Sequence, residues 1–373
     1  MISILHLLEH SFDQRQGGVE NFVSFLTKTS TPGLEQFLVR KAKLGGSYSL
    51  LQTLFGKKNF RLSAKALEKG LEILPSAPKD LRSSIFHIHQ ILPYGLKTLV
   101  QLSRQVPCVF TLHDYFPFCQ KVHFYPYHGG PCSGASVLKC SSCVGGSIKS
   151  PFLIPFFLTR NHHIQEYFQN VRALILPNDD LIEQVPCQFR SKTRVVPYSV
   201  PSCEFEEVEK SDALVFLGSI RQHKGIFVLI KELEDSGFQG NLDIYGPVDQ
   251  NLSLSNLPSF ARYKGILKNR SELKRYKAMV LPSLWKETGP LVVLEALEEG
   301  IRGFARKGSL SSTYSQSKSI HFYSHASEIL SMNEDDEIET IKGLQSLQAV
   351  RERHREIYEE VWESWYQRNI DVK

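Results

Sequence analysis

Two glutamates eight residues apart carry the clearest chemical signal in the sequence. Glu287 stands on a predicted loop after a strand that ends near Leu281, and Glu295 follows on a helix that begins near Pro290. Gly289 lets the backbone approach a ligand closely, and proline suits a first helical turn. Both carboxylates are therefore predicted to line one cleft, where they would accept hydrogen bonds from the hydroxyl groups of a sugar or a ribose.

A glycine turn with two cations follows another predicted strand. Gly218 comes directly after the strand, Arg221 and Lys224 follow within six residues, and Gly225 precedes a predicted helix. Amides at a helix start, together with Arg and Lys, compensate the charge of a diphosphate. The alternative interpretation is a solvated basic loop.

Two weaker signals lie in the first half of the chain, each after a predicted strand. Gly17 and Gly18 open a helix whose first amides could meet a phosphate, although a plain turn explains the pair equally well. His113 and Asp114 place an imidazole beside a carboxylate, which can hydrogen-bond a polar substrate or serve a structural role. Ligands of open parallel sheets bind outside the carboxyl ends of the strands, where all these residues fall.

Four of the seven cysteines cluster in an irregular stretch rich in Gly, Pro and Ser, at about residues 117–147. Four thiolates that close on a Cys-x2-Cys pair can hold a structural zinc ion, which would stabilise a segment with little core of its own. Free thiols, or a disulfide formed outside the cell, are the alternatives. The predicted ligands are Cys119, Cys132, Cys140 and Cys143.

The elements that position these residues alternate between short apolar strands and helices. Strands separated by helices predict parallel sheets, and here two doubly wound α/β domains that face each other, joined near residues 197–209. We predict domains over 1–203 and 204–350, and a terminal amphipathic helix that reaches from Glu339 to Trp365. The predicted strands are Ile2–Leu8, Ile85–His89, Cys108–Leu112, Ala173–Leu176, Arg194–Pro197, Leu214–Leu217, Leu242–Tyr245 and Ala278–Leu281.

Composition and charge exclude several classes of protein and favour certain kinds of binding partner. Hydrophobic residues at 42% and charged residues at 22% exclude a coiled coil or a mostly disordered chain, and no apolar run is long enough to span a membrane. Residues 1–200 hold 22 basic and 12 acidic residues, a balance of +10, whereas the remainder holds 22 and 27, a balance of −5. The basic half favours an anionic membrane or a phosphate-bearing substrate over nucleic acid. We expect a cytoplasmic protein.

Taken together, the motifs resemble retaining glycosyltransferases of the GT-B fold, most closely glycosyltransferase family 4. The Glu287-x7-Glu295 pattern matches the family, and short motifs on either side of it occur in the same order as in the family, along nearly the whole chain. They are Gly17-Gly18-Val19-Glu20, His87-Ile88-His89, Thr111-Leu112-His113-Asp114-Tyr115, Phe216-Leu217-Gly218, Lys224-Gly225, Ile244-Tyr245-Gly246, Lys264-Gly265 and Leu281-Pro282-Ser283-Leu284-Trp285.

The resemblance implies transfer of a sugar from a UDP or GDP donor with retention of configuration. It implies that Lys224, helped by Gly218 and Arg221, neutralises the diphosphate, that Glu295 holds the ribose, and that Glu287 contacts the donor sugar near the amides of Gly289, Pro290 and Leu291. His113 would face the transferred sugar, and Gly17 and Gly18 the donor phosphate or the acceptor. The family's terminal helix crosses back onto the first domain, which here corresponds to residues 351–373. Because no Asp-x-Asp is present to hold Mg²⁺ or Mn²⁺, we predict a metal-independent reaction.

Two departures from the family pattern support an alternative function. Ser219 stands where the family carries Arg, and no second glycine pair follows Phe304-Ala305, the candidate for the family's next strand. A catalytically weak or silent relative that binds a nucleotide or a glycan as a partner protein would fit both. A sugar-nucleotide epimerase is a third possibility, against which the glutamate pattern speaks.

The strongest apolar run, Pro151–Leu158, is explained either by burial in the first domain or by docking to a bilayer that carries a lipid-linked acceptor. Docking would place the protein peripherally on the inner face of the membrane, where it would extend a cell-surface glycan. The basic residues that would assist it are Arg40, Lys41, Lys43, Lys57, Lys58 and Arg61.

Overall fold

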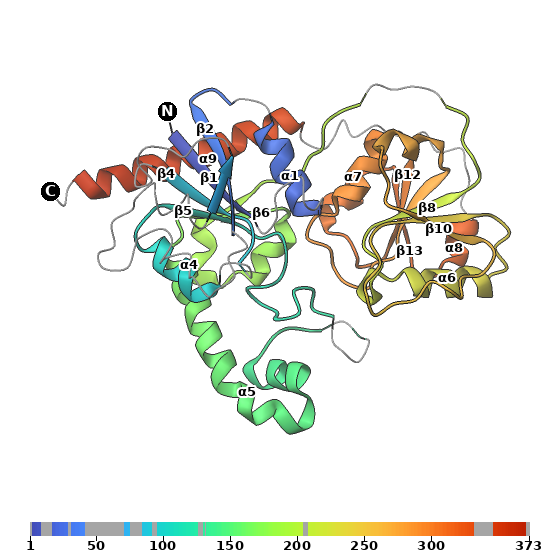
Figure 1. Ribbon diagram of the computed structural model, residues 1–373, viewed down its shortest axis with the longest axis horizontal. Helices are drawn as coiled ribbons and strands as arrows, with labels where there is room; N and C mark the ends of the chain where they lie inside the picture. The colour runs from blue at the N-terminus through green and yellow to red at the C-terminus, as the bar shows by residue number, and fades with distance from the viewer. Residues whose placement is uncertain are drawn as a thin grey trace. The chain divides into compact units, whose positions relative to one another are not determined.

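The computed structural model describes residues 2–8, 17–28, 31–41, 71–74, 84–91, 95–125, 130, 132–203, 208–331 and 346–370. The chain forms two compact units. The first comprises Met1–Val122, Ala135–Tyr198 and Ser346–Lys373, and the second comprises His123–Gly134 and Ser199–Gln345. Each has its own sheet, so both expected α/β domains are present (Figure 1).

The sheet of the first unit has seven described strands in the order β3-β2-β1-β4-β5-β6-β7. All neighbours are parallel except β2 and β3, which are antiparallel. The order grows outward from β1 in both directions, the doubly wound pattern. The strands are β1 (Ile2–Leu8), β2 (Leu34–Lys41), β3 (Leu71–Leu74), β4 (Ser84–Ile88), β5 (Cys108–Thr111), β6 (Ala173–Leu176) and β7 (Thr193–Val195).

Helices cover both faces of this sheet. Helix α1 (Gly18–Thr27) contacts α9 (Leu347–Ile370), and α4 (Leu96–Ser103) contacts α5 (Val137–Asn170) (Figure 1). Phe110 in β5 meets Tyr167 of α5, whereas the next residue, Thr111, bonds to His87, whose other nitrogen bonds to Tyr358 of α9. Because successive side chains of a strand point to opposite faces, α5 and α9 cover opposite sides of the sheet.

The second unit repeats the plan with six described strands, all parallel, in the order β10-β9-β8-β11-β12-β13. Helix α6 (Ile226–Asp235) follows β8, α7 (Leu291–Glu298) follows β11, and α8 (Ser327–Leu330) follows β13. The strands are β8 (Leu214–Leu217), β9 (Leu242–Tyr245), β10 (Ala261–Gly265), β11 (Ala278–Leu281), β12 (Arg302–Arg306) and β13 (Ile320–Tyr323).

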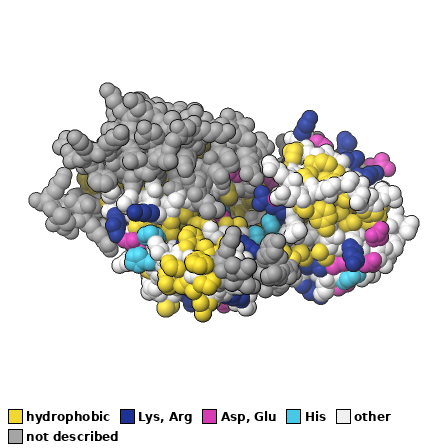
Figure 2. Space-filling model, turned by 60° about the horizontal axis from the view of Figure 1, so that its bottom comes forward, with side chains coloured by type: hydrophobic (Ala, Val, Ile, Leu, Met, Phe, Trp, Pro, Cys, Tyr) yellow, Lys and Arg dark blue, Asp and Glu magenta, His cyan; other side chains and the backbone are white. Residues whose placement is uncertain are grey.

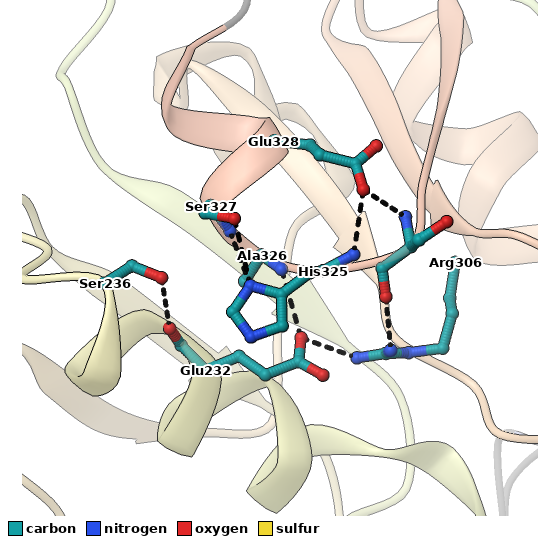
Figure 3. Close-up of polar contacts among 8 residues, drawn as sticks. Glu232, Ser236, Arg306, His325, Ala326, Ser327 and Glu328 are labelled. Carbon is teal, nitrogen blue, oxygen red and sulfur yellow. Dashed lines mark hydrogen bonds and ion pairs between the residues drawn. The ribbon is translucent and has the colours of Figure 1, made fainter.

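A polar network fixes the carboxyl end of β12 to the helices around it (Figure 3). The Arg306 guanidinium lies 2.9 Å from a carboxylate oxygen of Glu232 in α6, and the same oxygen accepts a bond from the amide of Ala326 just before α8. Glu328 accepts bonds from the amides of Ser324 and His325. The segment that leaves β12 therefore starts from an anchored residue.

Most predicted elements are confirmed to within two residues, and the differences are informative. Phe304 and Ala305 do lie in a strand, β12. A 3₁₀ helix, Arg270–Arg275, precedes β11, and the amino-terminal part of the expected terminal helix, residues 339–345, lies outside the described residues. The stretch expected to be irregular around the cysteines runs instead into the long helix α5, which continues through Pro151 and Pro155.

The apolar run on α5 is only partly buried. Phe157 is 2% exposed, whereas Phe152 is 83%, Phe156 50% and Leu158 56% exposed. Figure 2 shows hydrophobic side chains gathered on the face of the first unit that carries α5. Burial in the first domain therefore accounts for only part of this run. Among the described residues, no helix has the length and hydrophobicity needed to cross a bilayer.

Candidate functional site

A close and largely buried charge pair of the second unit joins two of the predicted site residues. Lys224 ends the 3₁₀ helix Gln222–Lys224 that follows β8, and Glu287 lies on the loop between β11 and α7. Lys224 Nζ is 2.7 Å from Glu287 Oε1. Because β8 and β11 are neighbours and parallel, their carboxyl ends bring these two loops together at one edge of the sheet.

Several further contacts hold the Glu287 carboxylate, which is 5% exposed. The Ser283 hydroxyl donates to the same Oε1 at 2.5 Å, and the Glu287 amide donates to the Ser309 carbonyl at 2.7 Å. Lys224 Nζ also lies 5.3 Å from the centroid of the Trp285 ring. A buried carboxylate that is paired with a cation and a hydroxyl has both its charge and its position fixed.

Two glycines allow these loops to pack so closely. A Cβ atom on Gly225 would lie 2.0 Å from the Pro282 carbonyl oxygen, and one on Gly246 would lie 1.9 Å from the Gly218 carbonyl oxygen. Both glycines have positive φ, +74° and +139°. Any other residue would push the backbones at the ends of β8, β9 and β11 apart.

The other predicted residues of the second unit have different partners. Arg221 Nε lies 3.7 Å from Asp249 Oδ2. Glu295, on α7, is largely buried, and its pKa is raised mainly by that burial; the Arg270 charge opposes the rise and Glu299 adds to it. Glu287 thus pairs with Lys224, whereas the Arg270 guanidinium, whose charge acts on Glu295, is hydrogen-bonded to Glu299 at 2.6 Å.

The start of α7 follows the predicted pattern. Pro290 occupies the position before the helix, its carbonyl accepts a bond from the Val293 amide, and Leu291 is the first helical residue. No side chain caps the helix, and Gly289 precedes the proline. The Val293 amide is thus engaged within the turn, and no capping side chain occupies the amides before it, which could meet an acceptor on a ligand.

In the first unit, Gly17 precedes α1 and its carbonyl accepts a bond from the Asn21 amide. A Cβ atom on Gly17 would lie 2.5 Å from a carboxylate oxygen of the buried Glu20, whereas one on Gly18 would meet no atom within 4 Å. Gly17 therefore makes room for the acidic side chain in the first helical turn, and Gly18 does not contribute to that room.

His113 and Asp114 do not act as a pair in the structure. The two ring nitrogens of the buried His113 bond to His89 and to Tyr198. Asp114 accepts a bond from the Phe116 amide at 2.7 Å, and burial raises its pKa to about 6. Asp114 therefore fixes a turn, while His113 belongs to a buried network of the sheet.

All four predicted zinc ligands lie in the described part of the chain, and none of them is in a disulfide. Cys119, Cys140 and Cys143 belong to the first unit and Cys132 to the second. Within the described part of the chain, only His6, His87 and His89 gather three or more potential metal ligands with all donor atoms within 4.8 Å of one another. The cysteines of the first unit do not form such a set, and zinc remains a prediction.

Comparison with known proteins gives the fold a name. No protein-family model matches the sequence, and no curated protein matches it. Solved structures do match over almost their whole length. HepE from Anabaena, in complex with UDP and glucose, is 13% identical, with a TM-score of 0.61 over 96% of this chain and 100% of that one. The chain has the GT-B fold.

Two more structures agree with this result. Sucrose-phosphate synthase from Thermosynechococcus elongatus is 15% identical, with a TM-score of 0.64 over 98% of this chain and 100% of the other. AviGT4, a glycosyltransferase involved in avilamycin A biosynthesis, is also 15% identical, with a TM-score of 0.55 over 97% and 98%. At such identities the likeness establishes the fold, and chemistry must be argued from the site.

Three contributors to the site were not identified as such from the sequence. Ser283 and Trp285 occur in a motif that was noted only for its resemblance to the family. Ser309 lies in the segment after Phe304-Ala305, where the family's second glycine pair is absent. The position of Ser283 two residues after β11 was the available signal. The contact of Ser309 depends on the return of β12 to the side of β11, which no local pattern reveals.

Proposed function

We propose that this chain transfers a sugar from a nucleoside diphosphate to a hydroxyl acceptor and keeps the anomeric configuration. The observation that supports this proposal most directly is the Lys224–Glu287 pair, which lies at the carboxyl ends of β8 and β11 in a GT-B fold. Among similar structures, HepE is in complex with UDP-glucose, which supports a UDP sugar as the first donor to test. Membership of glycosyltransferase family 4 is part of the proposal.

In this proposal Lys224, with Gly218 and Arg221 nearby in sequence, compensates the diphosphate charge. Glu295 binds the ribose hydroxyl groups, and Glu287 binds the donor sugar beside the amides that follow Gly289. In the protein without donor, the Lys224 charge is balanced by Glu287. A bound diphosphate would share Lys224 and draw the Glu287 carboxylate into the site together with the sugar.

Catalysis then rests on positioning and on stabilising charge. The bond between the anomeric carbon and the diphosphate oxygen breaks, and the diphosphate leaves with the electron pair. The acceptor oxygen bonds to the anomeric carbon on the same face and gives up its proton to the departing diphosphate. A metal-independent reaction is proposed, so turnover should survive EDTA.

The decisive experiment combines thermal unfolding with turnover for UDP, GDP and their sugars. A ligand at a hundredfold excess over its Kd should stabilise the protein by about 2.7 kcal/mol. Lys224→Met should abolish the shift, and Lys231→Met, which removes an exposed lysine of α6, should keep it. Stabilisation by one nucleotide class, with transfer of its sugar, supports the proposal; the absence of any shift contradicts it.

A second candidate is a non-catalytic GT-B protein that binds a nucleotide or a glycan as a partner. The pairing of Arg221 with Asp249 favours it, because that arginine is the replacement for the one absent at Ser219. Binding of a nucleotide sugar without transfer or hydrolysis, in the wild type and in Glu287→Gln alike, would support this candidate.

For the acceptor we propose a glycan or lipid-linked molecule at an anionic membrane surface. The support is the exposed apolar side chains of α5, Phe152, Phe156 and Leu158, which are typical of residues that enter the headgroup region. The six basic residues named for this role have side chains outside the described part of the structure. A structural zinc at Cys119, Cys132, Cys140 and Cys143 is a separate proposal, tested by metal analysis without chelators.

A further inference from the structure

Five buried histidines meet inside the first unit. None is more than 9% exposed. They come from the sheet and from the helix that covers it: β1 and β4 contribute one each, two follow the ends of β4 and β5, and α9 contributes the last. Burial lowers the pKa of each, so the rings are neutral at neutral pH, with one donor and one acceptor nitrogen apiece. They are His6, His87, His89, His113 and His354.

Three of these rings are joined head to tail. His113 Nε2 lies 2.8 Å from His89 Nδ1, and His89 Nε2 lies 3.0 Å from His6 Nδ1. At one end the Tyr198 hydroxyl bonds to His113 Nδ1, and at the other His6 Nε2 lies 3.0 Å from Gln36 Oε1. We call this series of five side chains, from Tyr198 to Gln36, the histidine row.

Each bond between two rings of the row joins Nε2 of one ring to Nδ1 of the next, so neutral rings can carry their protons in only two ways: all on Nε2 or all on Nδ1. A neutral ring that accepts at Nδ1 must donate from Nε2, so the direction of one bond fixes all the others. Both ends favour the same direction. The Tyr198 phenol is the most acidic donor of the row, and the amide oxygen of Gln36 has no proton to give. All three rings then carry their proton on Nε2, and each bond strengthens its neighbours.

We propose that the histidine row positions His113 at the carboxyl edge of the first sheet, with Tyr198 and Gln36 as positioning residues. The functional part rests on the proposed role of His113 beside the transferred sugar. Gln36 reaches His113 only through His6 and His89, so it acts by setting which nitrogen of each ring carries the proton. His113 is thereby held as a neutral ring in a single orientation.

A metal centre is the competing interpretation, because His6, His87 and His89 bring donor atoms within 4.8 Å. The hydrogen bonds favour the row. His87 is bonded at both nitrogens, each at 2.7 Å, to Tyr358 and to Thr111, and His89 is bonded at both nitrogens within the row. A metal ion would have to break the His6–His89 bond and one bond of His87.

The first test is ¹⁵N spectroscopy of the histidine rings in the full chain at neutral pH, where protonated and bare nitrogens give separate signals. His6, His89 and His113 should each show a protonated Nε2 and a bare Nδ1. A protonated Nδ1 on any of the three would overturn the row as drawn. One equivalent of tightly bound Zn²⁺ after purification without chelators, lost in His6→Gln, would replace it by a metal centre.

The second test compares two substitutions of Gln36, which is half-buried and lines a cavity of about 10 Å³ with His354 and Tyr358. Gln36→Glu keeps an acceptor for His6 and should keep all three ring states. Gln36→Met removes the acceptor, and His113 should then show a mixture of both ring states. For the active protein we expect kcat to fall about tenfold in Gln36→Met, with the donor KM unchanged, and to stay near the wild-type value in Gln36→Glu.

These readouts separate the two proposals. If the wild type transfers no sugar, the proposed function is wrong, but the ¹⁵N spectra of the rings still test whether the histidine row exists. If the ring states shift in Gln36→Met but kcat does not, the positioning role is wrong. A merely structural effect would lower the melting temperature of both variants without moving the proton on His113.

Discussion

Lys224 Nζ and Glu287 Oε1 lie 2.7 Å apart although sixty-three residues separate them in the chain. One residue follows β8 and the other follows β11, and only the pairing of these strands brings them together. The pair supplies a cation for a diphosphate and a carboxylate for a sugar, so its disruption should separate binding from chemistry.

We expect Glu287→Gln to lower kcat by about a hundredfold or more, as for loss of one polar group that stabilises a transition state. The amide keeps the shape of the side chain and leaves Lys224 free for the diphosphate, so nucleotide affinity should be unchanged or improved. Activity assays and calorimetry on the same preparation measure the two effects. Lys224→Met removes the cation and should have the opposite pattern, in which nucleotide affinity falls more than kcat. Equal effects of both variants on affinity would contradict this division of roles.

Many strands of the two sheets could be predicted from the sequence because a strand that is buried in a parallel sheet is a short run of apolar residues. β6, β8, β9 and β11 have the predicted bounds. Strands at or next to a sheet edge were missed for the converse reason: β2, which lies beside the edge strand β3, mixes charged and apolar residues, and the edge strand β13 carries half-buried ones. A run such as Leu34–Lys41 does not show from its composition which face will be covered.

The long helix α5 shows where local rules fail. Pro151 and Pro155 normally end a helix, and the segment before them is rich in Gly and Ser. The carboxyl-terminal part of the helix is held by tertiary burial of side chains such as Tyr167 and Phe168. In the site, likewise, the sequence predicted Lys224 and Glu287, but it did not predict that the charges of Arg270 and Glu299 act on Glu295, because Arg270 comes from another segment of the chain.

The close approach of Gly225 to Pro282 gives a test of the second unit's fold. A Cβ at Gly225 would lie 2.0 Å from a carbonyl oxygen, and φ is +74°, so Gly225→Ala combines strain with a backbone clash. Gly237 is the matched control, with φ of +69° and no atom within 4 Å of an added Cβ. Gly237→Ala should cost about 1 kcal/mol of unfolding free energy, the strain alone. Gly225→Ala should cost clearly more in urea unfolding, and equal losses would show that the loops can separate freely.

Acid should destabilise the first unit through its buried histidines. Burial lowers the pKa of His6 and His113 to about 3 and that of His354 to about 4, whereas unfolded histidine titrates near 6.5. Between pH 6.5 and 4 the unfolded chain therefore binds more protons than the folded one, and the unfolding free energy falls with falling pH. Each such proton contributes a slope of about 1.4 kcal/mol per pH unit.

Asp114 opposes this trend. Its folded pKa is raised to about 6, so between pH 6 and 4 the folded state binds that proton first, but it is a single carboxyl group against several histidines. Urea unfolding at pH 7.5, 6.5, 5.5 and 4.5 measures the balance. His6→Gln should flatten the dependence, and His162→Gln, which removes an exposed histidine, should flatten it less. A stability that stays constant down to pH 4.5 would mean that the rings can be charged where they are.

The exposed apolar face of α5 predicts binding to membranes. Phe152 and Phe156 are 83% and 50% exposed on a stretch of α5 in which Phe157 is buried and Leu153 and Ile154 are half-buried. Two phenylalanines that enter the headgroup region contribute about 1.5–3 kcal/mol each when fully buried, which is enough for reversible binding when basic residues assist. Flotation with liposomes that contain anionic lipid should carry the wild type upward and leave the double variant Phe152→Ser, Phe156→Ser in solution.

A control in the same helix separates membrane binding from damage to the fold. Thr159→Ser alters an exposed position of α5 and removes only one methyl group, so it should float like the wild type. Phe152 buries little area and Phe156 is half-buried, so the double variant should unfold at a temperature only a few degrees below that of the wild type. Flotation that is equal for neutral and anionic liposomes would assign the binding to the phenylalanines alone. A wild type that stays in solution with both would leave the acceptor to be sought among soluble glycans, because the α5 face would then have no role at a bilayer.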